Sequence, residues 1–450
     1  MKRLGLAFML CSMSAVVAAE ALTLEQAIER ALNSDPRIEE REHLVDAARA
    51  LEKQVSAHQG WFLEGNSFIA LTTTADGGFF SEGSCAANDC KVSDDRYNIN
   101  GLSPWFYLQV GLIKPLYTFG KIENYSAAAK ANTRIKGHDV SLQRGNTVLD
   151  VKRAYYGYLA ARDGRLLLTD VIKRLQSATD LVQQWLDSGE GDVSLSDLYA
   201  LQAGMAMVAK YQAQSQALER VALDGLKVVT GLGLAAELSV TARRLRPLPL
   251  PDYSLTVLQQ QALKQRPEMA QLEAGLQARR ALVEASKAEA KPNVYAGLMG
   301  GVSYAPGRES LESPYVYDPF HEAALTPVLG LKWSWAGKVV DAKTEVAEAE
   351  LNALISTSSL ARAGIPYQVA EQYHNMVGNA EAVAQLELAS RSARRWMIAS
   401  YTDFEAGLEK ADKVMAAFQA YVLASADYLQ TTYQYNMHVA QLEQVTGVAQ

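Results

Sequence analysis

The sequence lacks several features that would point to a particular chemistry. Its 43 Lys and Arg against 50 Asp and Glu leave a net charge of −7, which argues against nucleic-acid binding because that function needs a basic face. The six histidines share no metal-ligand spacing, and no nucleophile motif stands out. We therefore expect no catalytic residue, no metal and no cofactor, and the protein is predicted not to be an enzyme.

Long apolar runs are also missing. After the first segment, no stretch reaches the roughly 18 uncharged apolar residues of a membrane helix. The 49% hydrophobic and 21% charged residues nevertheless exclude a disordered chain. The mean hydropathy of −0.09 resembles that of a soluble protein.

The N-terminus has the organisation of a secretory signal peptide. Lys2 and Arg3 form a positive segment, residues 4–17 are apolar, and Val17-Ala18-Ala19 forms a cleavage site of small residues. We therefore expect residues 1–19 to be removed on export. The mature chain is then soluble in the periplasm, secreted, or held in the outer membrane by β-strands.

Short segments recur in the same order in the two halves of the chain. The segment ending in Asp35-Pro36 resembles the one ending in Arg266-Pro267, 231 residues later, and Tyr156 corresponds to Tyr373, 217 residues later. This order predicts two copies of one structural unit. The first repeat covers 20–246 and the second covers 254–450, and the Pro-rich linker 247–253 joins them.

Each copy is predicted to hold a helix, a strand hairpin and a long antiparallel helical hairpin. In the first copy these are a helix over 24–58, strands over about 61–74 and 104–117, and a helical hairpin over 121–230. In the second copy they are a helix over 256–290, strands over about 293–304 and 325–335, and a helical hairpin over 338–446. Val171, Leu175, Ala178, Val182 and Trp185 form a heptad seam. Pro366 can kink or interrupt its helix.

The predicted strands alternate weakly between two faces. Tyr107 and Gln109 face one way, whereas Phe106, Leu108 and Val110 face the other. About ten residues per strand, flanked by Trp and Tyr, suit an outer-membrane strand. An ordinary half-buried hairpin of a soluble protein fits the pattern equally well.

Four membrane strands cannot close a barrel, because the smallest barrels have about eight. An open edge in lipid would leave backbone groups unpaired, each at a cost of several kcal/mol. If the strands cross a membrane, the protein must therefore oligomerise. Two chains would give eight strands, and three would give twelve with room for a channel.

At the level of motifs the sequence resembles the TolC family of outer-membrane efflux and export ducts. Leu22-Thr23-Leu24-Glu25-Gln26-Ala27 leads into Asp35-Pro36, and Pro115-Leu116-Tyr117-Thr118-Phe119-Gly120-Lys121 marks a strand-to-helix junction. Pro115, Gly120 and Gly337 are the junction residues in the two copies. The duplicated plan adds to the resemblance, which covers essentially the whole mature chain.

The resemblance implies the fold and the partners. The fold class is mainly α with a β-barrel part, in which a homotrimer forms a 12-stranded transmembrane β-barrel continued by a periplasmic α-helical barrel. A mixed region is implied near 231–254 and the C-terminus. The protein would serve as exit duct of a tripartite efflux pump or a type I secretion system in the outer membrane of a Gram-negative bacterium. Its partners would be outer-membrane lipid, a periplasmic adaptor and an inner-membrane pump of the RND or ABC type, and no nucleic acid.

The same resemblance implies a gate at the periplasmic tips of the helical hairpins. A tip glycine followed six residues later by an aspartate matches Gly191 and Asp197. In the second copy the sixth residue after Gly407 is Lys413, so Asp403 and Asp412 are the acidic candidates there. Acidic rings would favour cations in the pore. Solvated turn residues and helix N-caps are the alternative interpretation of these side chains.

Two further patterns occur in the sequence. Cys85 and Cys90 lie in the polar loop between the first pair of strands, where the oxidising compartment favours a disulfide between them. Gly231-Leu232-Gly233 mimics a nucleotide-binding fingerprint, but it follows a helix, so we expect a helix C-cap. The alternative function is a soluble periplasmic coiled-coil adaptor or structural protein.

Overall fold

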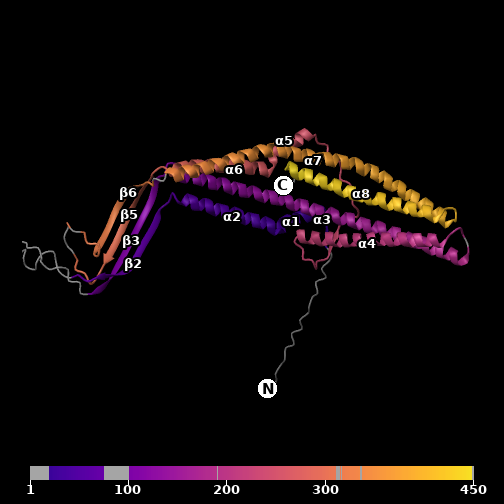
Figure 1. The fold of residues 1–450 in the computed structure, drawn as a ribbon, viewed down its shortest axis with the longest axis horizontal. Coiled ribbons are helices and arrows are strands. Elements are labelled where there is room, and N and C mark those ends of the chain that lie inside the picture. Colours follow the sequence, from indigo (N-terminus) through magenta and orange to yellow (C-terminus); the bar gives the residue numbers. More distant parts are fainter. Residues whose placement is uncertain are drawn as a thin grey trace, which may run out of the picture. The chain divides into compact units, whose positions relative to one another are not determined.

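The computed structural model describes residues 20–75, 101–189, 191–310, 315, 317–334 and 337–447. These residues are mainly helical, as predicted, and they form two groups of strands (Figure 1). The helices are α1 (Leu24–Ser34), α2 (Pro36–Ala57), α3 (Lys121–Ser188), α4 (Leu195–Val229), α5 (Leu255–Gln265), α6 (Pro267–Glu289), α7 (Gly337–Glu405) and α8 (Ala411–Thr446). The strands are β1 (Glu20–Leu22), β2 (Phe62–Thr73), β3 (Leu102–Tyr117), β4 (Leu238–Val240), β5 (Asn293–Tyr304) and β6 (Glu322–Lys332).

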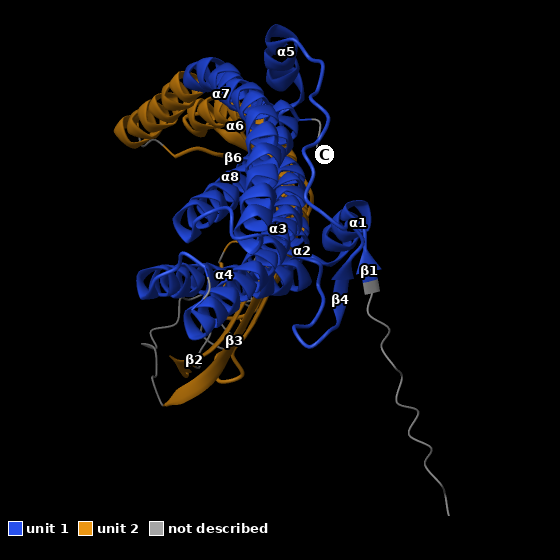
Figure 2. Cartoon of the chain, turned by 90° about the vertical axis from the view of Figure 1, so that its right-hand side faces the viewer, with its two compact units in different colours: residues 1–44, 136–271, 358–450 blue, residues 45–135, 272–357 orange. Residues whose placement is uncertain are grey.

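The chain divides into two compact units, which Figure 2 colours separately. Unit 1 consists of residues 1–44, 136–271 and 358–450, and unit 2 of residues 45–135 and 272–357. Each unit takes segments from both halves of the sequence. The two predicted sequence copies are therefore not two separate compact domains.

The sheet of unit 2 joins the strand hairpins from the two halves of the sequence. Its strand order is β2-β3-β5-β6, all antiparallel, with Gln109 of β3 opposite Gly301 of β5. Trp105 Nε1 donates a hydrogen bond to Ser303 Oγ across this central pair, at 2.7 Å. Gly330 lies beneath the ring of Tyr295, and an added Cβ there would approach the ring carbons to 2.4 Å. The missing side chain of Gly330 leaves the space that the ring of Tyr295 occupies, and a larger residue there would have to displace that ring.

Unit 1 packs its helices along heptad seams. Val171, Leu175, Ala178 and Val182 of α3 are completely buried, as their predicted seam requires. They form one core cluster with residues of α4, α7 and α8, including the buried Phe404 and Phe418. Helix α7 is continuous from Gly337 to Glu405 although it contains Pro366. The proline therefore does not interrupt this helix.

The helices that precede the strands are broken, where the sequence led us to expect continuous ones. In place of one helix over 24–58, α1 ends at Ser34 and α2 begins at Pro36, and Asp35 between them has an extended backbone. Likewise α5 and α6 replace the expected helix over 256–290 and meet at the extended Arg266. The physical reason is that a proline disfavours the helical conformation of the residue before it.

Side chains of α3 and α8 hold the linker region in place. Asn436, which is fully buried, donates to the carbonyl of Arg246 at 2.9 Å and accepts from the amide of Leu248 at 2.9 Å. Asp163 accepts from the amide of Leu245 at 2.8 Å. Burial, opposed by that hydrogen bond, raises the pKa of Asp163. These contacts replace the backbone pairing that an extended Pro-rich segment cannot make.

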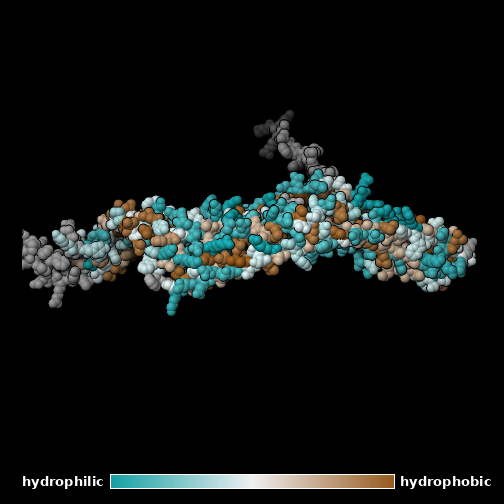
Figure 3. Space-filling view, turned by 90° about the horizontal axis from the view of Figure 1, so that it is seen from above, coloured by the Kyte–Doolittle hydropathy of each residue, from teal (hydrophilic) through white to brown (hydrophobic). Residues whose placement is uncertain are grey.

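None of the helices in the described residues is long and apolar enough to cross a membrane. In the view of Figure 3, the surface of the helices is largely hydrophilic with separate hydrophobic patches.

Candidate functional site

The sheet of unit 2 has two faces of opposite character. Because side chains alternate along a strand, one face collects large apolar residues from all four strands, and these are exposed. They are Leu63, Ile69, Leu71, Leu102, Phe106, Leu108, Val110, Leu298, Val302, Tyr304, Leu325, Leu329 and Leu331. An exposed apolar surface of this extent marks contact with lipid or with another protein.

The other face of the sheet carries polar and aromatic side chains. Glu64, Gln109 and Glu322 lie on it by strand register. Phe68 stacks on Tyr107 at 4.8 Å and meets Trp105 edge-on at 4.9 Å, both measured between ring centroids. The sheet therefore separates an apolar surface from one that water can wet.

Both edges of this sheet are open within the described part of the chain. Strand β2 pairs only with β3, and β6 pairs only with β5. Unpaired edge strands are templates for pairing with another chain. The sheet can therefore be extended at both sides.

The predicted junction residues lie at the transition from strand to helix. Pro115 faces Tyr295 in the sheet, and the register shifts between Pro115 and Tyr117. Gly120 has φ +86° and immediately precedes α3, and Gly337 is the first residue of α7. At Gly120 a positive φ is required, which explains the glycine.

At the first helix tip, Gly191 and Asp197 play defined structural parts. Gly191 has φ +79°, and a Cβ added there would meet the ring of Trp185 at 3.3 Å. Asp197 forms a capping box with Ser194, whose amide and hydroxyl donate to the carboxylate at 2.8 and 2.6 Å. Ser194 is therefore the N-cap of α4, and Asp197 is the third residue of the helix, which completes the capping box.

The second tip has a different construction. Gly407, with φ +71°, follows the end of α7, and the amide of Leu408 donates to the carbonyl of Asp403 at 2.8 Å. Asp412 is exposed in the first turn of α8, and the N-cap residue Lys410 makes no side-chain capping bond. The two tips thus present their acidic residues in unlike settings.

One ion pair and one aromatic contact connect the two tips. Lys410 Nζ lies 3.7 Å from a carboxylate oxygen of Asp192, and both side chains are exposed, so the pair contributes little. Below it, the rings of Trp185 and Phe404 meet edge-on with centroids 5.3 Å apart. Burial and a hydrogen bond to Glu405 raise the pKa of Tyr401 in the same region. The apolar core, rather than the ion pair, therefore holds the tips together.

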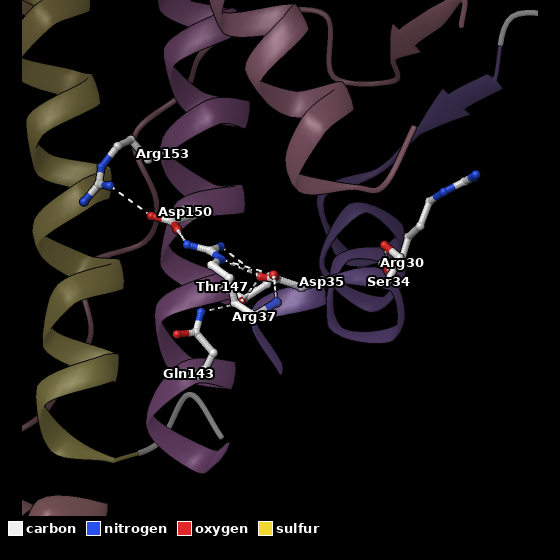
Figure 4. Close-up of polar contacts among 8 residues, drawn as sticks. All are labelled: Arg30, Ser34, Asp35, Arg37, Gln143, Thr147, Asp150 and Arg153. Atoms are coloured by element: carbon white, nitrogen blue, oxygen red, sulfur yellow. Dashed lines mark hydrogen bonds and ion pairs between the residues drawn. The ribbon is translucent and has the colours of Figure 1, made fainter. Parts of the chain in front are cut away.

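A polar cluster around the buried carboxylate of Asp35 fills the break between α1 and α2 (Figure 4). Asp35 accepts from Arg37 Nη2 at 2.8 Å and from Thr147 Oγ1 at 2.5 Å, and Arg37 Nη1 donates to Asp150 at 3.0 Å. Burial raises the pKa of Asp35, but the hydrogen bonds from Arg37 and Thr147 outweigh it and hold the pKa below its usual value. The cluster fastens the helix break to α3.

The break between α5 and α6 has a similar ion pair across its proline, but the basic residue precedes the proline and the acidic residue follows it. Here Arg266 precedes the proline and Glu268 follows it, and Arg266 Nη2 pairs with the Glu268 carboxylate at 2.5 Å. Arg266 Nη1 donates to Gln368 of α7 at 2.7 Å. Sequence reasoning missed both clusters, although opposite charges on either side of a proline in each half of the chain were a readable signal.

The remaining sequence predictions concern cofactors and the disulfide. Cys85 and Cys90 lie outside the described residues, so their pairing stays a prediction. Gly231 has φ +69° and follows Thr230, the C-cap of α4, so the glycine pattern there is a helix end. In the described residues, no three His, Cys, Asp or Glu side chains are grouped as a metal site.

Comparisons with known proteins identify the fold. Residues 258–448 match the family described as outer membrane efflux protein. The solved outer-membrane channel OprN is 18% identical, with 94% of this chain and 89% of that chain covered and a TM-score of 0.76. CmeC from Campylobacter jejuni is 13% identical over 95% and 86% of the two chains (TM-score 0.77). VceC from Vibrio cholerae is 14% identical over 94% and 96% (TM-score 0.74). No curated protein matches the sequence significantly.

These matches confirm the resemblance to the TolC family of outer-membrane channels that the motifs indicated. At 13–18% identity the solved structures establish the fold of the chain, and the family match assigns its second half.

Proposed function

We propose that this chain, whose residues 258–448 match the outer membrane efflux protein family, is the subunit of an outer-membrane channel that serves an efflux pump. The observation that carries the proposal is the sheet of unit 2, with one exposed apolar face, one polar face and two open edges. The apolar face suits the hydrocarbon of a membrane, and the polar face suits a water-filled channel. The localisation is the outer membrane of a Gram-negative bacterium, with a large periplasmic helical part.

Three copies would complete the sheet. Strands β2 and β6 would pair between neighbouring chains, and twelve strands would close a barrel wide enough for a channel. Closure also removes the edges, which lipid does not tolerate.

An exposed stripe on α4 supports the same assembly. We call it the α4 seam: Met207, Tyr211, Leu218, Val221 and Val228. Their steps of four, seven, three and seven residues place them on one side of a helix in a coiled coil. All are at least 47% exposed in the single chain. A helix of a neighbouring copy would cover them, as an apolar coiled-coil seam requires.

The helix tips would form the periplasmic entrance of the channel. A periplasmic adaptor and an inner-membrane pump, of the RND or ABC type, are the partners expected to meet it and to supply the energy. Tip contacts would hold the entrance closed, and docking of the partners would shift the population toward an open state. Gly191, Asp197, Asp403, Gly407 and Asp412 are the gate candidates in this proposal.

The adaptor alternative is not favoured. An adaptor would carry one helical hairpin in a β-rich body, whereas this chain has two long helical hairpins, α3–α4 and α7–α8. The efflux role is preferred over type I secretion because efflux is the function that the family description names.

Single-channel recording tests the proposed function. Protein extracted from outer membranes and added to a planar lipid bilayer is expected to give discrete current steps. Charge reversal at the tip, Asp197→Lys, is expected to change the conductance or its preference for cations. Gln216→Lys, on the exposed surface of α4, is the matched control. A bilayer that stays sealed contradicts the channel, and unchanged conductance in Asp197→Lys contradicts the gate role of that residue.

A further inference from the structure

The polar face of the sheet contains a hollow of about 220 Å³. We call it the sheet hollow; its walls include Tyr107, Gln109, Met299, Tyr317 and Glu322, and its floor includes Gly301. Among the described residues that line it there is no Lys or Arg, and the one formal charge among them is the carboxylate of Glu322. The hollow is thus acidic and aromatic at once.

Hydrogen bonds and ring contacts connect the walls of the hollow to the sheet. The hydroxyl of Tyr317 donates to Glu322 Oε2 at 3.0 Å. Ser303 Oγ donates to the carbonyl of Pro319 at 2.7 Å, which ties the segment after Tyr317 to β5. Phe320 packs on Trp105, with ring centroids 5.0 Å apart. These contacts place the tyrosine ring beside the carboxylate at the edge of the hollow.

The floor of the hollow is open because residue 301 is glycine. The nearest atom to a Cβ added at Gly301 is the carbonyl oxygen of Leu108 at 3.6 Å, an ordinary contact distance. A larger side chain therefore fits the backbone here. Since Gly301 lines the hollow, such a side chain would take up its space.

Aromatic faces beside a carboxylate and a thioether attract organic cations. A cation over a tyrosine ring within about 6 Å is stabilised by the ring quadrupole, and quaternary ammonium groups are recognised in this way. The same end of the sheet already shows the interaction, because the guanidinium of Arg308 lies 4.0 Å from the ring centroid of Phe320. A hollow of about 220 Å³ is smaller than a typical drug pocket, so it suits the head group of a larger molecule.

We propose that the sheet hollow is a binding site for quaternary ammonium and similar small organic cations on the inner wall of the channel. Glu322 supplies the charge, Tyr107 and Tyr317 the aromatic walls, and Gly301 the space. The proposal rests on the proposed function, because only in a closed barrel does the polar face line the channel. Three copies would place three such sites around one lumen.

The test is block of the single-channel current by tetraethylammonium. The wild-type channel is expected to be blocked, and Glu322→Gln to need at least about fivefold more tetraethylammonium for half block, in line with loss of the charge. Gly301→Val is expected to abolish the block by filling the hollow. Glu64→Gln removes a carboxylate from the same face outside the hollow and is expected to leave the block unchanged.

The outcomes separate the two proposals. Current steps without block by tetraethylammonium overturn the site and leave the channel in place. Equal weakening in Glu322→Gln and Glu64→Gln also overturns the site, because it shows a general effect of charge. Absence of any current overturns the channel and the site together. If Gly301→Val does not assemble, Glu322→Gln decides alone, since it keeps the shape of the side chain.

Discussion

Helices α4 and α8 follow the long helices of the two sequence copies, but they bury very different parts of their surfaces. Helix α4 has 35 residues, of which Leu198, Leu201 and Leu226 are buried. Helix α8 has 36 residues, of which thirteen are buried, and the stretch around Tyr435 and Leu442 packs against α5 and α7. The difference teaches that α8 buries much more of its surface within the chain than α4 does, and that the α4 seam stays exposed in the single chain.

The largest expected effect comes from a charge in the α4 seam. Val221 is 69% exposed in the single chain, so Val221→Asp should leave its fold intact. In the assembly the carboxylate would be buried without a partner, at a cost of several kcal/mol in each interface. We expect sedimentation of the detergent-extracted protein to show single chains in place of trimers. Gln216→Asp, on another side of α4, is the control, and a trimer that survives Val221→Asp argues against the seam.

Truncation of one leucine in each helix tests the comparison within a single chain. Leu442 of α8 is 4% exposed and Leu218 of α4 is 61% exposed. Leu442→Ala should lower the free energy of unfolding by about 3 kcal/mol, and Leu218→Ala by less than about 0.5 kcal/mol. Urea titration of dissociated chains measures both. Equal losses would mean that α4 is already packed within the chain.

The two polar clusters at the helix breaks are expected to differ less in their contribution to the free energy of unfolding. Asp35→Asn should cost about 2 kcal/mol, because its carboxylate is 5% exposed and accepts charge-assisted hydrogen bonds. Glu268→Gln should cost less, since its carboxylate is 35% exposed. Thermal unfolding of the two variants ranks them, and the reverse order would contradict this account.

The Asp35 cluster also predicts a pH dependence. The pKa of Asp35 is lowered in the folded chain, so its contribution is complete above the unfolded pKa of about 3.9. That contribution is lost as the pH falls through the lower folded pKa. The difference in melting temperature between wild type and Asp35→Asn should therefore be constant from pH 7 to about 5 and shrink below about pH 4. A difference that grows on acidification would reverse the assigned sign.

The smallest expected effect distinguishes the two tips. Asp197→Ala removes the capping box of α4 and should cost about 1 kcal/mol. Asp412→Ala removes only a charge from the first turn of α8 and should cost less than about 0.5 kcal/mol. Melting temperatures of the two variants measure both losses. Equal melting temperatures would contradict the prediction that the acidic residue of the first tip stabilises its helix more than that of the second.

Structural features that depend on residues close together in the sequence could be predicted from it. The seam from Val171 to Val182 was readable because its partners lie at coiled-coil spacing, and all its residues are buried. The helix break at Asp35 was missed as a break, although Pro36 predicts it, because apolar spacing continues across it.

Features that depend on pairing between the two halves could not be read in advance. The sheet hollow needs β3 beside β5, which brings Gln109 opposite Gly301. The α4 seam was equally hidden, because apolar spacing does not say whether the covering helix belongs to the same chain. Burial in the structure separates the two cases, as Leu218 and Leu442 illustrate.

The central claim is that three copies of this chain form one channel in the outer membrane. Its most direct test is fractionation of cells that make the protein, followed by electrophoresis with and without prior heating. The account predicts a band of three chains in the outer-membrane fraction that heating converts to a single chain of 49.1 kDa less its signal peptide. A soluble periplasmic protein that migrates as one chain under both conditions would contradict it.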